Sequence, residues 1–341
     1  MKSLQLLSIQ LATPLLLLGV NIRECRKRCG PLLIAFILAS AGTMIASIIA
    51  YPLCSSLLQG AMGIDGLKIA AALMAKNVGG GLNYIAVCRS LSASPNAIAA
   101  GLCVDNIFAL LYFPAISALA VGEPDPIKVH AETDLDEGND EGEGNNSTSI
   151  TSRISAETIS STVAIGAVLT WLGEKFGGQS AALPLATLLT IAFTMVLPST
   201  AKALSSTGEA VGTAFLYIFF ATAGAPGLNI AESIRASFVP IGLYLTMLYG
   251  IHGFVLFAAR KIVLSCRMKF NNQAETNDSC VVPSRLLVAS SAAIGGPATA
   301  AALAKANKWN SLVAPSLIVG NLGYAIATFA GILFYKAFCS M

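Results

Sequence analysis

Three consecutive glycines at residues 79–81 interrupt a long apolar stretch, and Gly-Gly-Pro at residues 295–297 interrupts another one late in the chain. A glycine costs a helix about 1 kcal/mol relative to alanine, and a proline costs more, so each stretch is predicted to hold a broken helix. When Asn106 is set opposite Asn321, the two breaks fall opposite one another without a gap. Matched breaks in two halves of a membrane protein indicate a transport site.

Composition places both breaks in a membrane protein. The mean hydropathy is +0.71 and only 11% of the residues are charged, whereas soluble domains carry about 25% charged residues. The net charge of +3 is too small to indicate a nucleic-acid partner. The chain has 2 histidines and 8 cysteines, without Cys-x-x-Cys spacing, which gives no basis for a metal site. No cofactor is predicted, apart from H⁺ or Na⁺ as a coupling ion.

Apolar runs near the length that crosses a bilayer, about 20 residues, recur along the chain. A polar linker at residues 122–153 carries half of the 18 acidic residues, a composition that predicts disorder. It separates a first membrane repeat, residues 1–121, from a second one, residues 154–341. The predicted spans are residues 4–22, 31–53, 96–121, 156–176, 182–202, 211–226, 238–263 and 311–338, with broken elements at 65–91 and 283–308.

A second internal echo supports the repeat. The sequence GVNIREC at residues 19–25 recurs as GLNIAES at residues 227–233, and Pro31 after the first copy corresponds to Pro240 after the second. Two apolar runs precede this motif's helix in the second unit, whereas only residues 1–2 precede it in the first. We therefore expect that about two N-terminal helices are missing relative to a symmetric parent, through a truncated gene model, a splice form or natural loss.

The positions of basic loops decide how the two units are oriented. Basic loops favour the cytoplasmic side of a membrane. The loops at residues 23–28 and 260–269 fall on the same side only if each glycine break is the tip of a re-entrant hairpin. The predicted fold is therefore an all-α integral membrane protein with an inverted-repeat transporter fold and two glycine-broken helices, re-entrant or discontinuous.

Asp105 is the acid that lies deepest in a predicted span. A charge at bilayer depth costs about 2.5 kcal/mol or more and usually lines an ion or proton pathway, although a structural carboxylate held by neighbouring amides is the alternative. Lys76 could neutralise Asp105, hold an anionic substrate or extend to the membrane surface. The breaks expose backbone groups that attract ions, or they allow tight packing of small residues. The predicted ion-binding and substrate-binding residues are Asp105, Asn106, Asn321, Gly79, Gly80, Gly81, Asn83, Gly295, Gly296 and Thr299.

The two broken segments resemble a known family. IGGPATAAALAKANKWNSLVAPSLIVGNLGYAIATFAG and VGGGLNYIAV with GLCVDNIFALLYF are similar to the YjcL-like family of uncharacterised membrane proteins, domain of unknown function 819. The resemblance covers nearly the whole chain and implies a place in the cation:proton antiporter and anion transporter superfamily. It also implies inverted repeats, broken elements that meet at the membrane midplane, and N-terminal helices beyond those present here.

These observations predict an ion-coupled secondary transporter of a small solute that works by alternating access, and no enzyme activity. The alternatives are a membrane subunit of an enzyme and an inactive or regulatory truncated form. The expected partners are the lipid bilayer, a small-molecule substrate and a second copy in a homodimer. We expect a multi-pass protein, in a plastid membrane if the source is a plant and otherwise in the plasma membrane.

Overall fold

The structure, a computed structural model, describes residues 2–20, 29–126, 155–224, 230–269 and 280–340, and these residues form helices and no strand. The prediction of an all-α fold is confirmed for this part of the chain. The helices are α1 (Lys2–Leu17), α3 (Gly30–Met62), α4 (Asp65–Gly79), α5 (Gly81–Ser90), α6 (Pro95–Ala120), α7 (Ala156–Val196), α8 (Pro198–Gly224), α9 (Ile230–Lys269), α10 (Pro283–Gly295), α11 (Pro297–Ala306) and α12 (Asn310–Cys339).

Four of the described helices are long and apolar enough to cross a membrane: α3, α6, α9 between Glu232 and Val263, and α12. Local signals fix their ends. The Ser94 hydroxyl accepts the Ala97 N–H and Pro95 occupies the first turn, so α6 begins here. At the end of α3, Gly63 has a φ of 56° and its N–H bonds to the Gln59 carbonyl, which stops the helix.

The predicted boundary between two of the runs is wrong. Runs at residues 182–202 and 211–226 were expected, with polar residues between them. Instead α7, which is kinked at Gly178 (φ 60°), ends at Val196, and α8 continues unbroken from Pro198 to Gly224. Proline has no N–H to donate and is therefore best placed in the first turn of a helix. The polar residues before position 211 consequently lie inside a helix, and Glu209 is among them.

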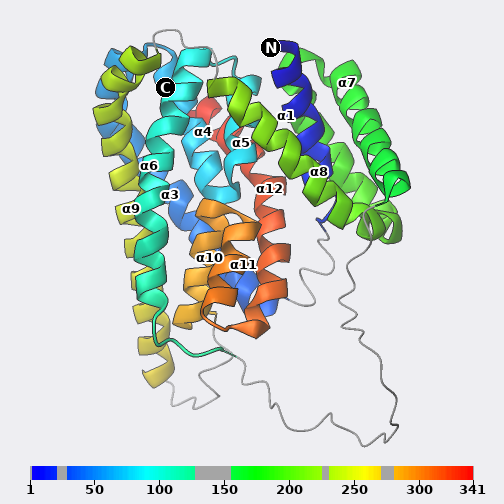
Figure 1. The fold of residues 1–341 in the computed structure, drawn as a ribbon. Coiled ribbons are helices and arrows are strands. Elements are labelled where there is room, and N and C mark those ends of the chain that lie inside the picture. The colour runs from blue at the N-terminus through cyan, green and yellow to red at the C-terminus, as the bar shows by residue number, and fades with distance from the viewer. Residues whose placement is uncertain (1, 21–28, 127–154, 225–229, 270–279, 341) are drawn as a thin grey trace, which may run out of the picture.

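The helices surround two central pairs of short helices (Figure 1). In that view α4 and α5 occupy the upper middle of the molecule, and α10 and α11 lie below them. Helices α6 and α9 lie on one side, α1, α7 and α8 lie on the other, and α12 runs beside both pairs. The short pairs therefore form the centre of the molecule.

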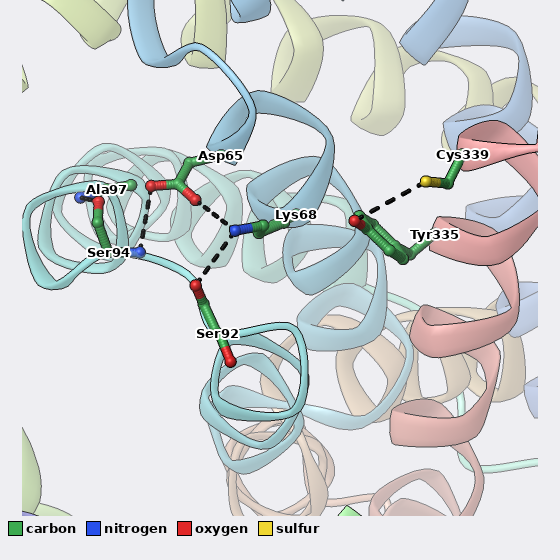
Figure 2. A network of polar contacts seen from close by, with 7 residues as sticks. All are labelled: Asp65, Lys68, Ser92, Ser94, Ala97, Tyr335 and Cys339. Atoms are coloured by element: carbon green, nitrogen blue, oxygen red, sulfur yellow. Dashed lines mark hydrogen bonds and ion pairs between the residues drawn. The ribbon is translucent and has the colours of Figure 1, made fainter. Parts of the chain in front are cut away.

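Helices α4 and α5 form a hairpin, because polar contacts join its two open ends (Figure 2). The Ser94 N–H donates to the Asp65 carboxylate at 3.1 Å, and the Lys68 ammonium donates to the Ser92 carbonyl at 3.1 Å. Lys68 also pairs with Asp65 at 2.9 Å. A continuous helix at 1.5 Å per residue would separate Asp65 from Ser94 by about 40 Å. The chain therefore reverses between the two helices.

We expect Asp65→Asn to loosen this hairpin in a pH-dependent way. Burial alone would raise the pKa of Asp65, but hydrogen bonds from Ser94 and Lys68 together lower it below the ordinary value. A carboxyl whose folded pKa is depressed adds stability above its unfolded pKa, about 3.9, and loses that stability as pH falls through the folded value. The variant should therefore unfold a few degrees earlier than wild type in detergent at pH 7, with the difference shrinking towards pH 3. A constant difference would contradict this.

Several predicted segments lie wholly or partly outside the described residues: the GVNIREC and GLNIAES motifs, the basic loop at residues 23–28, and most of the acidic linker. The basic loop predicted at residues 260–269 is wrong, because α9 continues as a helix to Lys269. The start of the linker is described, and it is packed. The Trp309 indole donates to the Glu123 carbonyl at 2.8 Å, and the Asp125 carboxylate accepts the N–H and hydroxyl of Ser311. The expected disordered connector is therefore ordered at its beginning, up to residue 126, because Asp125 satisfies N-terminal donors of α12.

Candidate functional site

The tips of the two helical pairs meet at Gly80 and Gly296. These glycines separate α4 from α5 and α10 from α11, with φ values of 87° and 84°. That backbone conformation is accessible to glycine and strained for other residues. A Cβ built on Gly80 would lie 3.7 Å from the Gly296 Cα, so the backbones are in near contact. The Tyr324 ring covers both tips, 3.0 Å from that Cβ and with its hydroxyl 3.2 Å from one built on Gly296.

The structure corrects the register of the two breaks. The ungapped comparison set Gly80 against Gly295, whereas the backbone conformations match Gly80 with Gly296. The same spacing pairs Ser92 with Lys308, the two non-glycine residues with positive φ in the described chain. The N-cap residues of the next helices, Ser94 for α6 and Trp309 for α12, again match in the ungapped alignment that pairs Asn106 with Asn321. One residue fewer in the second connecting loop accounts for the shift.

The glycines at these breaks serve two purposes. Gly80 and Gly296 supply the turn, whereas Gly79 and Gly295 allow close packing. A Cβ on Gly79 would lie 2.3 Å from the Gly323 carbonyl oxygen on α12, and one on Gly295 would lie 2.7 Å from the Phe113 ring on α6. Gly81 begins α5. Both readings of the glycines, broken helix and tight packing, therefore apply at adjacent positions.

Asn83 and Thr299 bond to the breaks themselves. The Asn83 amide donates to the Gly79 carbonyl at 2.8 Å, and its oxygen accepts the Thr328 hydroxyl at 2.7 Å. The Thr299 hydroxyl lies 2.9 Å from the Gly296 carbonyl and 3.2 Å from the Ser291 carbonyl. Each side chain follows its turn glycine by three residues and donates to a backbone carbonyl at the break, and the Gly296 carbonyl also accepts the Ala300 N–H at 3.3 Å. These contacts hold the tips in shape.

Asp105 pairs with Lys76. The Asp105 side chain on α6 is fully buried, and the Lys76 ammonium on α4, one turn before the break, forms an ion pair with it. The Asn77 amide donates to the other carboxylate oxygen at 3.3 Å and to the Leu73 carbonyl at 2.8 Å. A buried carboxylate is thus matched by an ammonium and a carboxamide, as a charge in a poorly solvated place requires.

A chain of hydrogen bonds leads from this pair to α10, the first helix of the second central pair. The Thr43 hydroxyl on α3 lies 3.1 Å from the Asn77 carbonyl and 2.9 Å from His252 Nδ1 on α9. His252 Nε2 lies 2.8 Å from the Ser290 hydroxyl on α10, and that hydroxyl lies 2.7 Å from the Tyr112 hydroxyl on α6. The chain therefore connects α4 to α10 through buried side chains of α3 and α9.

Stacked tyrosines close this chain into a ring. The Tyr249 hydroxyl on α9 donates to the Asn77 side-chain oxygen at 3.0 Å. The Tyr249 ring stacks on Tyr112, with centroids 5.6 Å apart and planes 19° apart. Asn77 therefore contacts three helices at once, and a shift of α4 at this residue would be transmitted to α3, α6 and α9.

Two predicted site residues lie away from Asp105. Asn106 follows Asp105 on α6 and is exposed. Asn321 lies on α12 beside the residues that follow α1, where its amide nitrogen is 3.0 Å from a Cβ built on Gly19, and Ser205 lies beside it. The structure brings together Asp105 with Lys76, and Gly80 with Gly296, and it leaves both asparagines outside that group. Gly320, which matches Asp105 in the second unit, packs against Pro297.

Sequence reasoning missed Asn77, Thr43, His252, Ser290 and Tyr249. Their partners lie on helices far away in the chain, so no local pattern reports them. One signal was present for His252, an ionisable residue near the middle of a predicted apolar run. Another was present for Asn77, a polar residue directly before the break.

The fold and this buried polar centre define a class, the all-helical membrane proteins with broken helices that meet near the middle of the molecule. Within that class, the chain belongs to the family described as "Protein of unknown function (DUF819)", whose model matches residues 4–341. The sequence-based family prediction is therefore confirmed. The chain is also 29% identical over 347 residues to the uncharacterized membrane protein YjcL of Bacillus subtilis (strain 168), covering 95% of this chain and 80% of that protein. No solved structure matches the chain.

Proposed function

We propose that this protein is an H⁺-coupled or Na⁺-coupled secondary transporter of a small solute, working by alternating access. One observation carries the proposal: two hairpin tips meet at Gly80 and Gly296 close to the buried Asp105–Lys76 pair. Helix N-termini attract anions and C-termini attract cations. We call the point where the two tips meet the hairpin crossing. Helices α5 and α11 begin there and present N-termini, and α4 and α10 end there and present C-termini. Transporters use this arrangement to hold substrate and coupling ion.

The contacts between equivalent residues support an inverted repeat. Gly80 and Gly296 are equivalent, and they are in contact. In the register that matches Pro31 with Pro240, Thr43 matches His252, and these two residues are hydrogen-bonded. Residues that contact their own equivalents lie on a local two-fold axis. The hairpins approach this axis from opposite ends of the molecule (Figure 1), so we propose that they are re-entrant from opposite sides of the membrane.

The ion pair gives the transporter a switch. In the structure the Lys76 ammonium forms an ion pair with the Asp105 carboxylate. A proton or a Na⁺ ion that binds Asp105 would compete with the Lys76 ammonium and release it. Because Lys76 and Asn77 are neighbours at the end of α4, this release would change the hydrogen bonds that run to Thr43 and His252. Ion binding at one hairpin would thereby reach the other one.

The proposed activity needs no catalytic step and no bound cofactor besides the coupling ion. The bilayer is the proposed surrounding, and a homodimer is the proposed assembly. We further propose membership of the cation:proton antiporter and anion transporter superfamily. A plastid membrane, for a plant protein, or otherwise the plasma membrane is the proposed location.

Solute uptake by Asp105→Asn tests this function. The full chain is reconstituted into phosphatidylcholine and phosphatidylglycerol vesicles and exposed to a mixture of small solutes, with an imposed H⁺ or Na⁺ gradient and without one. Mass spectrometry of the vesicle contents then identifies any gradient-driven solute. We expect uptake by wild type and a loss to the protein-free level in the variant, because the carboxamide cannot bind the ion as a carboxylate does.

Glu157→Gln is the matched control, because Glu157 is an exposed acid in the first turn of α7. It should transport as wild type does. Unchanged, gradient-dependent uptake by Asp105→Asn would remove Asp105 from the mechanism. Absence of any gradient-driven uptake by wild type would reject the transporter proposal.

A further inference from the structure

A second acid lies beside the crossing of the hairpin tips. Glu209 lies near the middle of α8, eleven residues after Pro198 and fifteen before Gly224. Helix α8 packs closely on α1 through small residues, since a Cβ on Gly208 would lie 2.7 Å from the Leu15 carbonyl oxygen. The next residue, Glu209, is nevertheless exposed.

Tyr324 marks the depth of Glu209. This tyrosine on α12 contacts both tip glycines. Glu209 on α8 and Tyr324 on α12 each follow, by about one helical turn, a residue that lies beside Gly19, namely Ser205 and Asn321. The carboxylate is therefore at the level of the crossing, on the side of α1 and α8. Asp105 belongs to α6, and this helix lies with α9 on the other side of the molecule (Figure 1).

Further oxygen-bearing side chains lie one helical turn from this carboxylate. Asn321 precedes Tyr324 by three residues and Ser205 precedes Glu209 by four, so each pair shares a helix face. Asn321 and Ser205 both lie next to Gly19, which brings the two faces together. Carboxylate, carboxamide and hydroxyl oxygens are the ligands that a hard cation prefers. The side chains of Asn321, Ser205 and Tyr324 carry no positive charge that would repel a cation.

The two acids differ in whether they are neutralised. Asp105 has its charge matched by Lys76. Within the described part of the chain, Glu209 has no hydrogen bond or ion pair. Ionisable groups at membrane depth face the protein interior or a water-filled cavity, and they mark ion or proton pathways. An unpaired, accessible carboxylate at this depth is thus open to a mobile cation.

We propose that Glu209 binds a monovalent cation, H⁺ or Na⁺, at a second site on the α8 side of the hairpin crossing, with Tyr324 and Asn321 beside it. The two acidic sites would then flank one crossing, and a transport cycle would involve two cation sites instead of one. The inference rests on the proposed transporter for what the cation drives, but binding itself can be measured without transport.

The test is labelling of the wild-type full chain by dicyclohexylcarbodiimide in phosphatidylcholine and phosphatidylglycerol vesicles. This apolar reagent reaches carboxyl groups through the lipid and reacts with their protonated form. Peptide mass spectrometry then gives the extent of labelling at each acid, in NaCl and in choline chloride at equal ionic strength. Asp105, paired and buried, and Glu157, exposed near the start of α7, are internal controls.

We expect several-fold more label on Glu209 than on either control. Protection of Glu209 by NaCl relative to choline chloride identifies Na⁺ as the ligand, and equal labelling in both salts identifies H⁺. Tyr324→Phe should weaken any protection by NaCl and leave the label itself in place. Labelling of Glu209 no stronger than that of Glu157 would overturn the proposal. Because uptake is not measured, this result and the uptake experiment with Asp105→Asn can fail independently.

Discussion

Replacing Lys76 by methionine is expected to lower the free energy of unfolding by about 3–5 kcal/mol, the usual cost of leaving one member of a buried ion pair without its partner. The Asp105 side chain is fully buried and Lys76 is only 10% exposed, so water cannot replace the lost ammonium. Asn77 alone would remain to match the charge at 3.3 Å. Thermal unfolding of the purified protein in detergent, followed by intrinsic fluorescence, measures the loss.

The double variant Lys76→Met/Asp105→Asn separates the pair from general damage to the site. It removes both charges and keeps a side-chain oxygen that can accept from Asn77. A neutral, well-packed replacement of a buried pair is often as stable as the original, so the double variant should regain most of the lost stability. Lys305→Met, at an exposed position on α11, should change the stability by no more than about 0.5 kcal/mol. A double variant as unstable as Lys76→Met would show that the two charges are not coupled.

The sequence predicted most of the helices because their apolar runs are long and their breaks are marked by glycine. The helices are interrupted within residues 79–81 and 295–297, as expected. The error at α8 has a physical reason. Segment ends were placed where apolarity falls, but a helix can continue through polar residues where its small side chains pack on a neighbour, as Gly208 does on α1. Pro198 was the better marker of a helix start.

The candidate site was predictable only in its acid and its glycines. Asp105 stands out as a charge inside an apolar run, whereas its pairing with Lys76 depends on how α4 is rotated against α6. Sequence spacing does not determine that rotation. The same limit applies to Asn106 and Asn321, which are equivalent in sequence yet lie on opposite sides of the hairpin crossing. Glu209 was passed over because its helix was predicted to begin after it.

Gly320→Ala is expected to cost about 1–3 kcal/mol, the range for adding a methyl group to a filled interior. A Cβ at this position would lie 2.5 Å from the Pro297 Cα and 2.6 Å from the Pro297 nitrogen, which are backbone atoms of the second hairpin tip. No rotation of a side chain can relieve that contact, so α11 must move away from α12. Because Pro297 follows Gly296 directly, the displaced backbone includes the point where the tips meet, and the proposed solute uptake should fall together with the melting temperature.

Gly253→Ala is the matched control, because a Cβ there, on an exposed face of α9, would meet nothing within 4 Å. Alanine favours a helix over glycine by about 1 kcal/mol, so this variant should be as stable as wild type or slightly more stable. If both alanine variants melt alike, α12 does not hold the tip as the structure has it. The comparison of the two variants also bears on how the two repeat units differ. Asp105 places a charge in the first unit, whereas its equivalent in the second unit, Gly320, packs against the backbone of Pro297. If Gly320→Ala alone is destabilised, this position of the second unit serves as a packed support, and the proposed cation binding is left to Asp105 and Glu209.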